Sequence, residues 1–161
     1  MICGGKPKVI EFNCRFGDPE SQAVLPLLEG NLAELMMEAA AGSLDGARVS
    51  TRPGAAVCVV MASGGYPDSY QKGNKITFSS ELKDREDIVV FHAGTARSGE
   101  EVVTAGGRVL GVTGLGEDVI KAAQRAYEGV DAISFEGMYC RRDIGYREIN
   151  RLKAMRDNEI S

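Results

Sequence analysis

Hydrophobic and polar positions alternate with a period of two near the start of the chain, in the stretch VIEFNCRF (residues 9–16). One set of alternate positions is apolar and consists of Ile10, Phe12, Cys14 and Phe16. The other set carries Val9, Glu11, Asn13 and Arg15. A period of two is typical of a β-strand that buries one face. The pattern therefore predicts a strand over residues 8–16, with an acid, an amide and a base along its polar face.

A short helix is expected directly after this strand. Asp18 is a residue type that caps helix N-termini, and Pro19 is favoured at the first helical position. Pro26 is expected to bend or end the helix, because proline removes a backbone donor and clashes with the preceding turn. The helix N-terminus would also attract an anion, through its free N–H groups.

A second helix is predicted from Asn31, because Glu34 follows three residues later and completes a capping pattern. Apolar residues then recur at helical spacing, and Gly42 marks the end of the helix. The Met36-Met37 pair lies among these apolar positions and is expected to belong to a core.

The character of the chain changes in residues 44–54, where the helical pattern gives way to strands. The elements expected beyond this boundary are strands over residues 55–62, 76–79 and 88–92, a hairpin over 100–114 with Gly106-Gly107 at its turn, a helix over 117–129, a strand over 135–140 and a charged helical tail from Tyr146. This order predicts an α/β fold whose second part is a small, mainly antiparallel β domain with one packed helix.

Composition narrows the class of protein. The 161 residues are 43% hydrophobic and 26% charged, which is typical of a globular chain. A net charge of -4 argues against a general nucleic-acid binder. No apolar run approaches the roughly 20 residues that span a bilayer, so no membrane partner is expected. The four cysteines are scattered, which favours a reducing, cytoplasmic environment over a disulfide framework or zinc site.

The polar face of the predicted strand is the strongest candidate for chemistry. Glu11 offers a carboxylate and Asn13 an amide carbonyl, and hard cations such as Mg²⁺ prefer oxygen ligands shared with phosphates. Arg15 follows on the same face and is suited to hold a phosphate oxygen. The alternative is an edge strand whose polar face meets water, with Glu11 and Arg15 paired.

Five motifs give a family resemblance that runs from Lys8 to Ile149. In chain order they are EFNCRFGDPESQ, VVMASGGYP, VFHAGT, VVTAGGRVLGVTGLG and YCRRDIGYR. Together they resemble the end of the ATP-grasp domain and the C-terminal domain of the phosphoribosylamine–glycine ligase family. The resemblance implies three parts: residues 1–44 ending an ATP-grasp domain, residues 55–150 forming the C-terminal domain, and residues 151–161 forming the helical tail.

The resemblance also implies a reaction, in which ATP, glycine and 5-phosphoribosylamine give glycinamide ribonucleotide, ADP and phosphate by way of glycyl phosphate. It implies Mg²⁺ or Mn²⁺ held by Glu11 and Asn13, and Arg15 as the catalytic residue at the transferring phosphate. Weaker substrate-binding candidates are Asp18, His92 and Arg108. Each has a simpler alternative: helix capping for Asp18, a core or turn hydrogen bond for His92 and a surface salt bridge for Arg108.

The segments that clamp ATP in this family have no counterpart in the sequence. The chain is therefore expected to be a C-terminal portion that needs the N-terminal portion of the enzyme as its partner and is inactive alone. Exposure of the apolar strand face would favour aggregation or self-association. Two alternatives stay open: another ATP-grasp ligase or carboxylase, and a non-catalytic module that binds nucleotide or a partner chain.

Overall fold

The computed structural model describes residues 2–10, 12, 14–44 and 46–160. Its strands are β1 (Ile2–Cys3), β2 (Lys6–Pro7), β3 (Leu28–Glu29), β4 (Ser50–Thr51), β5 (Ala55–Ser63), β6 (Thr77–Phe78), β7 (Ile88–His92), β8 (Thr95–Ser98), β9 (Glu101–Thr104), β10 (Arg108–Gly116), β11 (Ile133–Ser134) and β12 (Met138–Cys140). Its helices are α1 (Glu20–Val24), α2 (Leu32–Ala40), α3 (Val119–Asp131) and α4 (Tyr146–Ile160), with short 3-10 turns η1 (Leu25–Leu27) and η2 (Ser80–Leu82).

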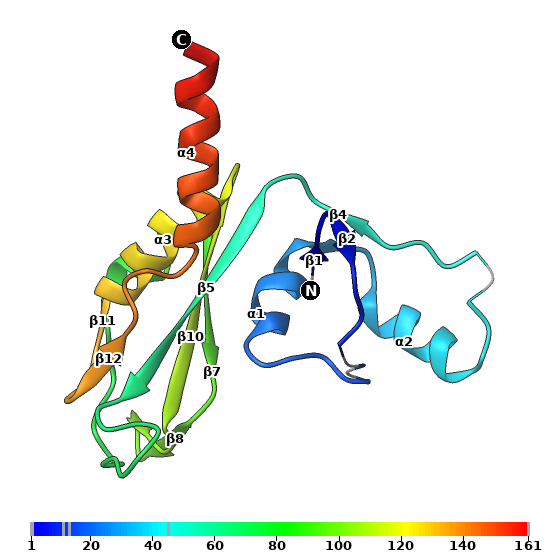
Figure 1. Cartoon of the computed structure of the whole chain (residues 1–161). Coiled ribbons are helices and arrows are strands. Elements are labelled where there is room, and N and C mark those ends of the chain that lie inside the picture. Colours follow the sequence, from blue (N-terminus) through cyan, green and yellow to red (C-terminus); the bar gives the residue numbers. More distant parts are fainter. Residues whose placement is uncertain (1, 11, 13, 45, 161) are drawn as a thin grey trace.

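A four-stranded antiparallel sheet forms the centre of the fold, in the order β12-β5-β10-β7 (Figure 1). The apolar run AAVCVVMAS becomes β5, as predicted, because a continuous apolar strand is stable only where both faces are covered. The strand predicted over residues 88–92 is β7. The expected α/β fold with mainly antiparallel pairing is therefore confirmed.

Helix α3 covers one face of the sheet and completes the hydrophobic core. Its buried face is built from small residues, including Ala122 and Ala126, so the helix backbone approaches β10 closely. A Cβ atom at Gly114 of β10 would lie 2.2 Å from the Ala122 carbonyl oxygen and 2.3 Å from the Ala126 nitrogen. Asp118 caps the helix by accepting a hydrogen bond from the Lys121 N–H at 2.8 Å. The helix predicted over residues 117–129 is confirmed.

The N-terminal segment covers part of the opposite face through α1 (Figure 1). The Thr113 hydroxyl of β10 donates a hydrogen bond to the Gln22 carbonyl oxygen at 2.9 Å. Gly111 lies under the Gln22 side chain, since a Cβ atom there would come 3.8 Å from its Cγ atom. These contacts place α1 against the middle of β10, and α1 also contacts β5. The short helix predicted after Asp18 is thus confirmed.

The predicted strand over residues 8–16 is wrong for this structure. Its described residues form no strand, and the short β1–β2 pairing precedes them. A strand needs a neighbour to satisfy its N–H and C=O groups, and no strand among the described residues pairs with this segment. The apolar side chains are consequently exposed: Ile10 is 70% and Phe12 86% accessible.

The second predicted helix is confirmed, but the expected burial of its methionines is not. Asn31 Oδ1 accepts a hydrogen bond from the Glu34 N–H at 3.3 Å, and Gly42 follows the helix end with a φ of 72°. Met36 and Met37 are 51% and 73% exposed. The reason is the position of α2, which lies at the outer end of the N-terminal segment, away from the sheet (Figure 1).

The predicted hairpin over residues 100–114 is also wrong. Strand β9 pairs with the preceding β8, whereas β10 pairs with β5 and β7. Gly106 packs against the backbone of Gly94, where a Cβ atom would lie 2.9 Å from the Gly94 Cα. The paired glycines therefore serve a close backbone contact instead of a two-residue hairpin turn. The strand predicted over residues 135–140 is limited to β12.

The charged tail forms α4, which projects beyond the sheet (Figure 1). Arg156 anchors it to the start of α3 through an ion pair with Asp118 at 2.6 Å. In the part of the chain that the structure describes, no helix has the length and apolar character needed to cross a membrane.

An ion-pair group joins the segment before β7 to α3 and makes stability depend on acid pH. Asp87 accepts from Arg85 at 2.7 Å and contacts Arg125 at 3.0 Å, and the hydrogen bond from Arg85 holds the Asp87 pKa below its usual range. A lowered folded-state pKa stabilises the protein above the unfolded pKa of about 4, and this contribution is lost as pH falls through the folded value.

We expect Asp87→Asn to be less stable than the unmodified chain at pH 7 in urea unfolding, with the difference shrinking below about pH 4. Asp84→Asn, in the same loop, is the control, and an Asp87→Asn difference independent of pH would contradict the assignment.

Candidate functional site

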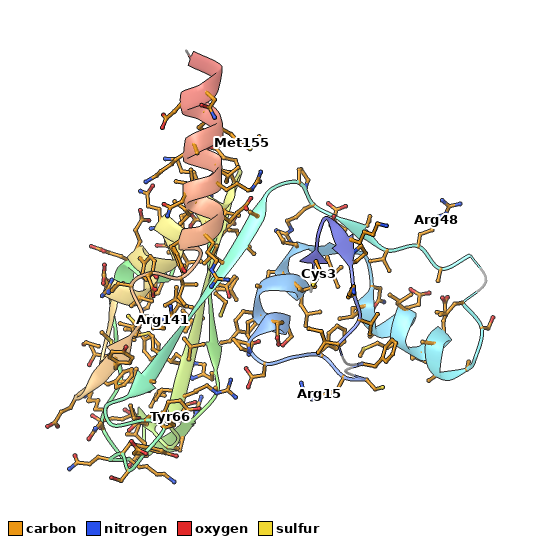
Figure 2. The ribbon with its side chains drawn as sticks, viewed as in Figure 1. Cys3, Arg15, Arg48, Tyr66, Arg141 and Met155 are labelled. Atoms are coloured by element: carbon orange, nitrogen blue, oxygen red, sulfur yellow. The ribbon has the colours of Figure 1, made fainter. Side chains whose placement is uncertain are left out.

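The proposed metal ligands Glu11 and Asn13 lie outside the described residues. Arg15 is exposed, and its Nη1 donates to the neighbouring Phe16 carbonyl oxygen at 3.1 Å. Figure 2 shows it on the N-terminal segment, away from the central sheet. Among the described residues, no group of three or more His, Cys, Asp or Glu side chains is arranged to hold a metal ion. The metal–phosphate site thus stays a prediction from the sequence.

Two of the predicted substrate contacts, Asp18 and Arg108, do come together across 90 positions of sequence. Arg108 Nη2 donates to the Asp18 carboxylate at 2.8 Å, and Nη1 donates to the Asp18 carbonyl oxygen at 3.1 Å. Asp18 also accepts from the Gln22 side-chain amide at 2.9 Å. The expected capping role of Asp18 is wrong, because Pro19 occupies the N-cap position and no side chain caps α1. Asp18 instead orients the guanidinium group of Arg108.

A cavity of about 300 Å³ opens beside this pair, on the α1 side of the sheet. The apolar side chains that line its base come from β5, and charged and aromatic side chains surround them. The lining residues share this one hollow although they come from five segments of the chain: Pro19, Cys58, Val60, Ala62, Tyr66, Arg108, Tyr139, Cys140, Arg141 and Ile144. Figure 2 shows Tyr66 and Arg141 on the part of the molecule that contains the sheet. We call this hollow the Arg108 cavity.

Sequence reasoning missed the aromatic and second cationic members of the Arg108 cavity. Tyr66 packs over Gly107, where a Cβ atom would lie 2.1 Å from the ring. Arg141 is held by a two-point contact with Asp143 at 2.9 and 2.7 Å. The only sequence signal was the presence of these residues in the motifs GGYP and YCRRDIGYR. Their spacing along the sequence does not indicate that they line the same cavity.

Electrostatics in the cavity are set by paired charges and a neutral thiol. The hydrogen bond between Arg141 and Asp143 raises the pKa of the guanidinium and lowers that of the carboxyl group. Burial raises the pKa of the Cys58 thiol, partly offset by its hydrogen bond with Thr113. Cys58 is therefore protonated at neutral pH and is poorly suited to act as a nucleophile.

His92 does not join this site. It lies opposite Leu110 in the β7–β10 ladder, and Leu110 belongs to the core beneath α3, so His92 is on the other face of the sheet. Its Nδ1 is 3.1 Å from the Thr95 hydroxyl, within the turn that follows β7. A larger hollow of about 610 Å³, between β6, β11 and α3, contains none of the candidate residues. The geometry therefore favours the Arg108 cavity.

The small antiparallel sheet with one packed helix places the chain in the α/β class, with the fold of part of a solved ligase structure. Residues 56–147 match the family model for "Phosphoribosylglycinamide synthetase, C domain". The chain belongs to this family.

Named relatives and a solved structure agree with this assignment. The phosphoribosylamine–glycine ligase of Vibrio cholerae is 52% identical over 93% of this chain and 35% of the relative. The trifunctional purine biosynthetic protein adenosine-3 of Gallus gallus is 50% identical over 97% of this chain and 16% of that protein. The crystal structure of phosphoribosylamine–glycine ligase from Thermotoga maritima superposes with a TM-score of 0.76 and 38% identity, over 90% of this chain and 35% of that one. The chain thus spans about a third of the length of the single-function relatives.

Proposed function

We propose that the chain is the C-terminal portion of an enzyme that joins glycine to 5-phosphoribosylamine in purine biosynthesis. The single observation that carries the proposal is the 52% identity to a phosphoribosylamine–glycine ligase over 93% of the chain. In the proposed reaction, the glycine carboxylate takes the γ-phosphoryl group of ATP, which gives glycyl phosphate and ADP. The amine of phosphoribosylamine then attacks the acyl carbon, and phosphate leaves.

The proposed catalytic role of the N-terminal segment is to neutralise charge on the transferring phosphate. The donor set of Glu11 and Asn13, a carboxylate and an amide oxygen, suits Mg²⁺ or Mn²⁺, and such an ion would offset phosphate charge when bound. Arg15 adds N–H donors to the phosphate oxygens. Its exposed position leaves the guanidinium group accessible, with one donor engaged by Phe16.

The Arg108 cavity is the proposed site for the phosphate of the sugar substrate. The backbone carbonyl and the carboxylate of Asp18 both accept hydrogen bonds from Arg108, so the guanidinium group is already positioned before the substrate binds. Asp18 then acts by holding Arg108. His92 remains a prediction from the sequence, since it lies on the face of the sheet opposite the Arg108 cavity.

The proposed partner is the N-terminal portion of the same ligase. Large hydrophobic residues are exposed in the first third of the chain: Val9, Ile10, Phe12, Phe16, Val24, Met36, Met37, Leu44 and Val49. So many exposed large apolar side chains in one segment of a chain are typical of an interaction site. Self-association of the chain through the same surface is the competing outcome. The proposed location is the cytoplasm, with neither nucleic acid nor membrane as partner.

We expect the isolated chain to release no ADP with ATP, glycine and phosphoribosylamine, because its described residues hold no complete phosphate-binding site. A chimaera that joins the first two thirds of the Vibrio cholerae relative to this chain is expected to turn over at about 1–1,000 per second. Coupled detection of ADP measures both. Turnover by the isolated chain in that range would contradict the proposal.

The same assay separates the alternatives. ATP hydrolysis by the chimaera that bicarbonate stimulates without glycine would identify a carboxylase and overturn the proposed reaction. Tight, magnesium-dependent ATP binding by the isolated chain would favour the independent nucleotide-binding module instead.

A further inference from the structure

The Arg108 cavity offers stacking surfaces that a sugar phosphate does not use. Tyr66 and Tyr139 line it while remaining 43% and 59% exposed. Tyrosine rings presented to solvent beside an apolar floor suit planar aromatic ligands, which stack on them. The volume of about 300 Å³ is at the lower end of the range for small-molecule sites. The lining therefore favours a ligand with a flat, aromatic part.

Two guanidinium groups give the same cavity an anion-binding rim. Each arginine carries five N–H donors, and Arg108 and Arg141 each use two of them on a neighbouring aspartate. The donors that remain are suited to phosphate oxygens through charge-assisted hydrogen bonds. Asp18 and Asp143 largely cancel the positive charge, so phosphate alone would bind weakly. A ligand that also contacts the apolar and aromatic surface would therefore bind more tightly than a sugar phosphate.

We propose that the Arg108 cavity binds a nucleoside monophosphate, with its base stacked on a tyrosine ring of the lining and its phosphate at the arginines. The base distinguishes this ligand from the sugar phosphate of the proposed reaction. Because both would place a phosphate at Arg108, the nucleotide would compete with the sugar substrate and act as a regulator. That regulatory consequence rests on the proposed function, whereas binding by the chain does not.

Calorimetric titration of the 161-residue chain without divalent metal tests the proposal, with AMP, ribose 5-phosphate and adenosine as probes. AMP is expected to bind at least about ten-fold more tightly than either fragment, since each fragment lacks one of the two contacts. Binding of ribose 5-phosphate within about two-fold of AMP would overturn the proposal, since stacking of even one base should separate them further. Absence of AMP binding would overturn it too. Ligase activity of the chimaera is a separate readout, so either proposal can fail alone.

A matched pair of variants locates the site. Arg141 and Arg151 are similarly exposed arginines, each held by a carboxylate, and only Arg141 lines the cavity. Arg141→Gln is expected to weaken AMP binding at least about ten-fold, the effect of losing charge-assisted hydrogen bonds. Arg151→Gln is expected to leave it unchanged. Equal affinities of the two variants for AMP would overturn the assignment to this cavity.

The cysteines allow the same test without any substitution. Cys58 and Cys140 line the cavity, while Cys3 and Cys14 are exposed elsewhere. AMP is expected to slow alkylation of Cys140 by iodoacetamide, measured by mass spectrometry, without slowing that of Cys3 or Cys14. An unchanged rate at Cys140 under saturating AMP would contradict the proposal.

Discussion

Arg15→Ala in the active chimaera is expected to lower kcat by about 100- to 1,000-fold, the usual cost of removing one group that stabilises transferring charge. The reason is that Arg15 is proposed to meet charge that develops on phosphate as it leaves ATP. If the interaction strengthens mainly in the transition state, kcat falls while the KM for ATP changes little. Steady-state kinetics with coupled ADP detection separates the two constants.

Arg48→Ala is the matched control, because Arg48 is also an exposed arginine of the N-terminal segment and belongs to neither proposed site (Figure 2). Its kcat is expected to stay close to that of the unmodified chimaera. An Arg15→Ala variant with normal kcat and a folded circular dichroism spectrum would refute the catalytic role. A raised KM with unchanged kcat would assign Arg15 to ground-state binding of ATP instead.

Gly114→Ala is expected to lower the free energy of unfolding by about 3 kcal/mol, the upper part of the usual range for overpacking a core. The added Cβ atom would meet the backbone of α3 at 2.2 and 2.3 Å, and backbone cannot rotate away as a side chain can. The helix has to move off β10, which opens the core that both elements share. Urea unfolding followed by circular dichroism measures the change.

Gly99→Ala separates this packing effect from the general cost of replacing a glycine. Gly99 lies in the β8–β9 turn with a φ of 62°, and a Cβ atom there meets nothing within 4 Å. Its cost is expected to be about 1 kcal/mol, from the left-handed backbone alone. A Gly114→Ala loss no larger than that of Gly99→Ala would show that α3 adjusts to the added methyl group.

The sequence located the candidate chemistry only in part. Glu11, Asn13 and Arg15 stood out because their alternation concentrates oxygen ligands and a cation within a few residues. The Arg108 cavity gave no comparable local signal. Its tyrosines and second arginine lie in separate segments, and only the pairing of β5 with β10 and β12 brings those segments together.

The local sequence pattern was enough to predict β5, β7, α2 and α3. An apolar run, or apolar residues at helical spacing behind a capping residue, specifies its strand or helix largely without partners that are distant in the sequence. Tertiary structure decided the remaining features. It left residues 8–16 without a strand neighbour, paired β9 with β8, and turned Asp18 from a helix cap into the partner of Arg108. The physical reason is common to all three. A polar or charged group pairs with a group that the fold brings close to it in space, and the positions of the two groups in the sequence do not show which pairs will form.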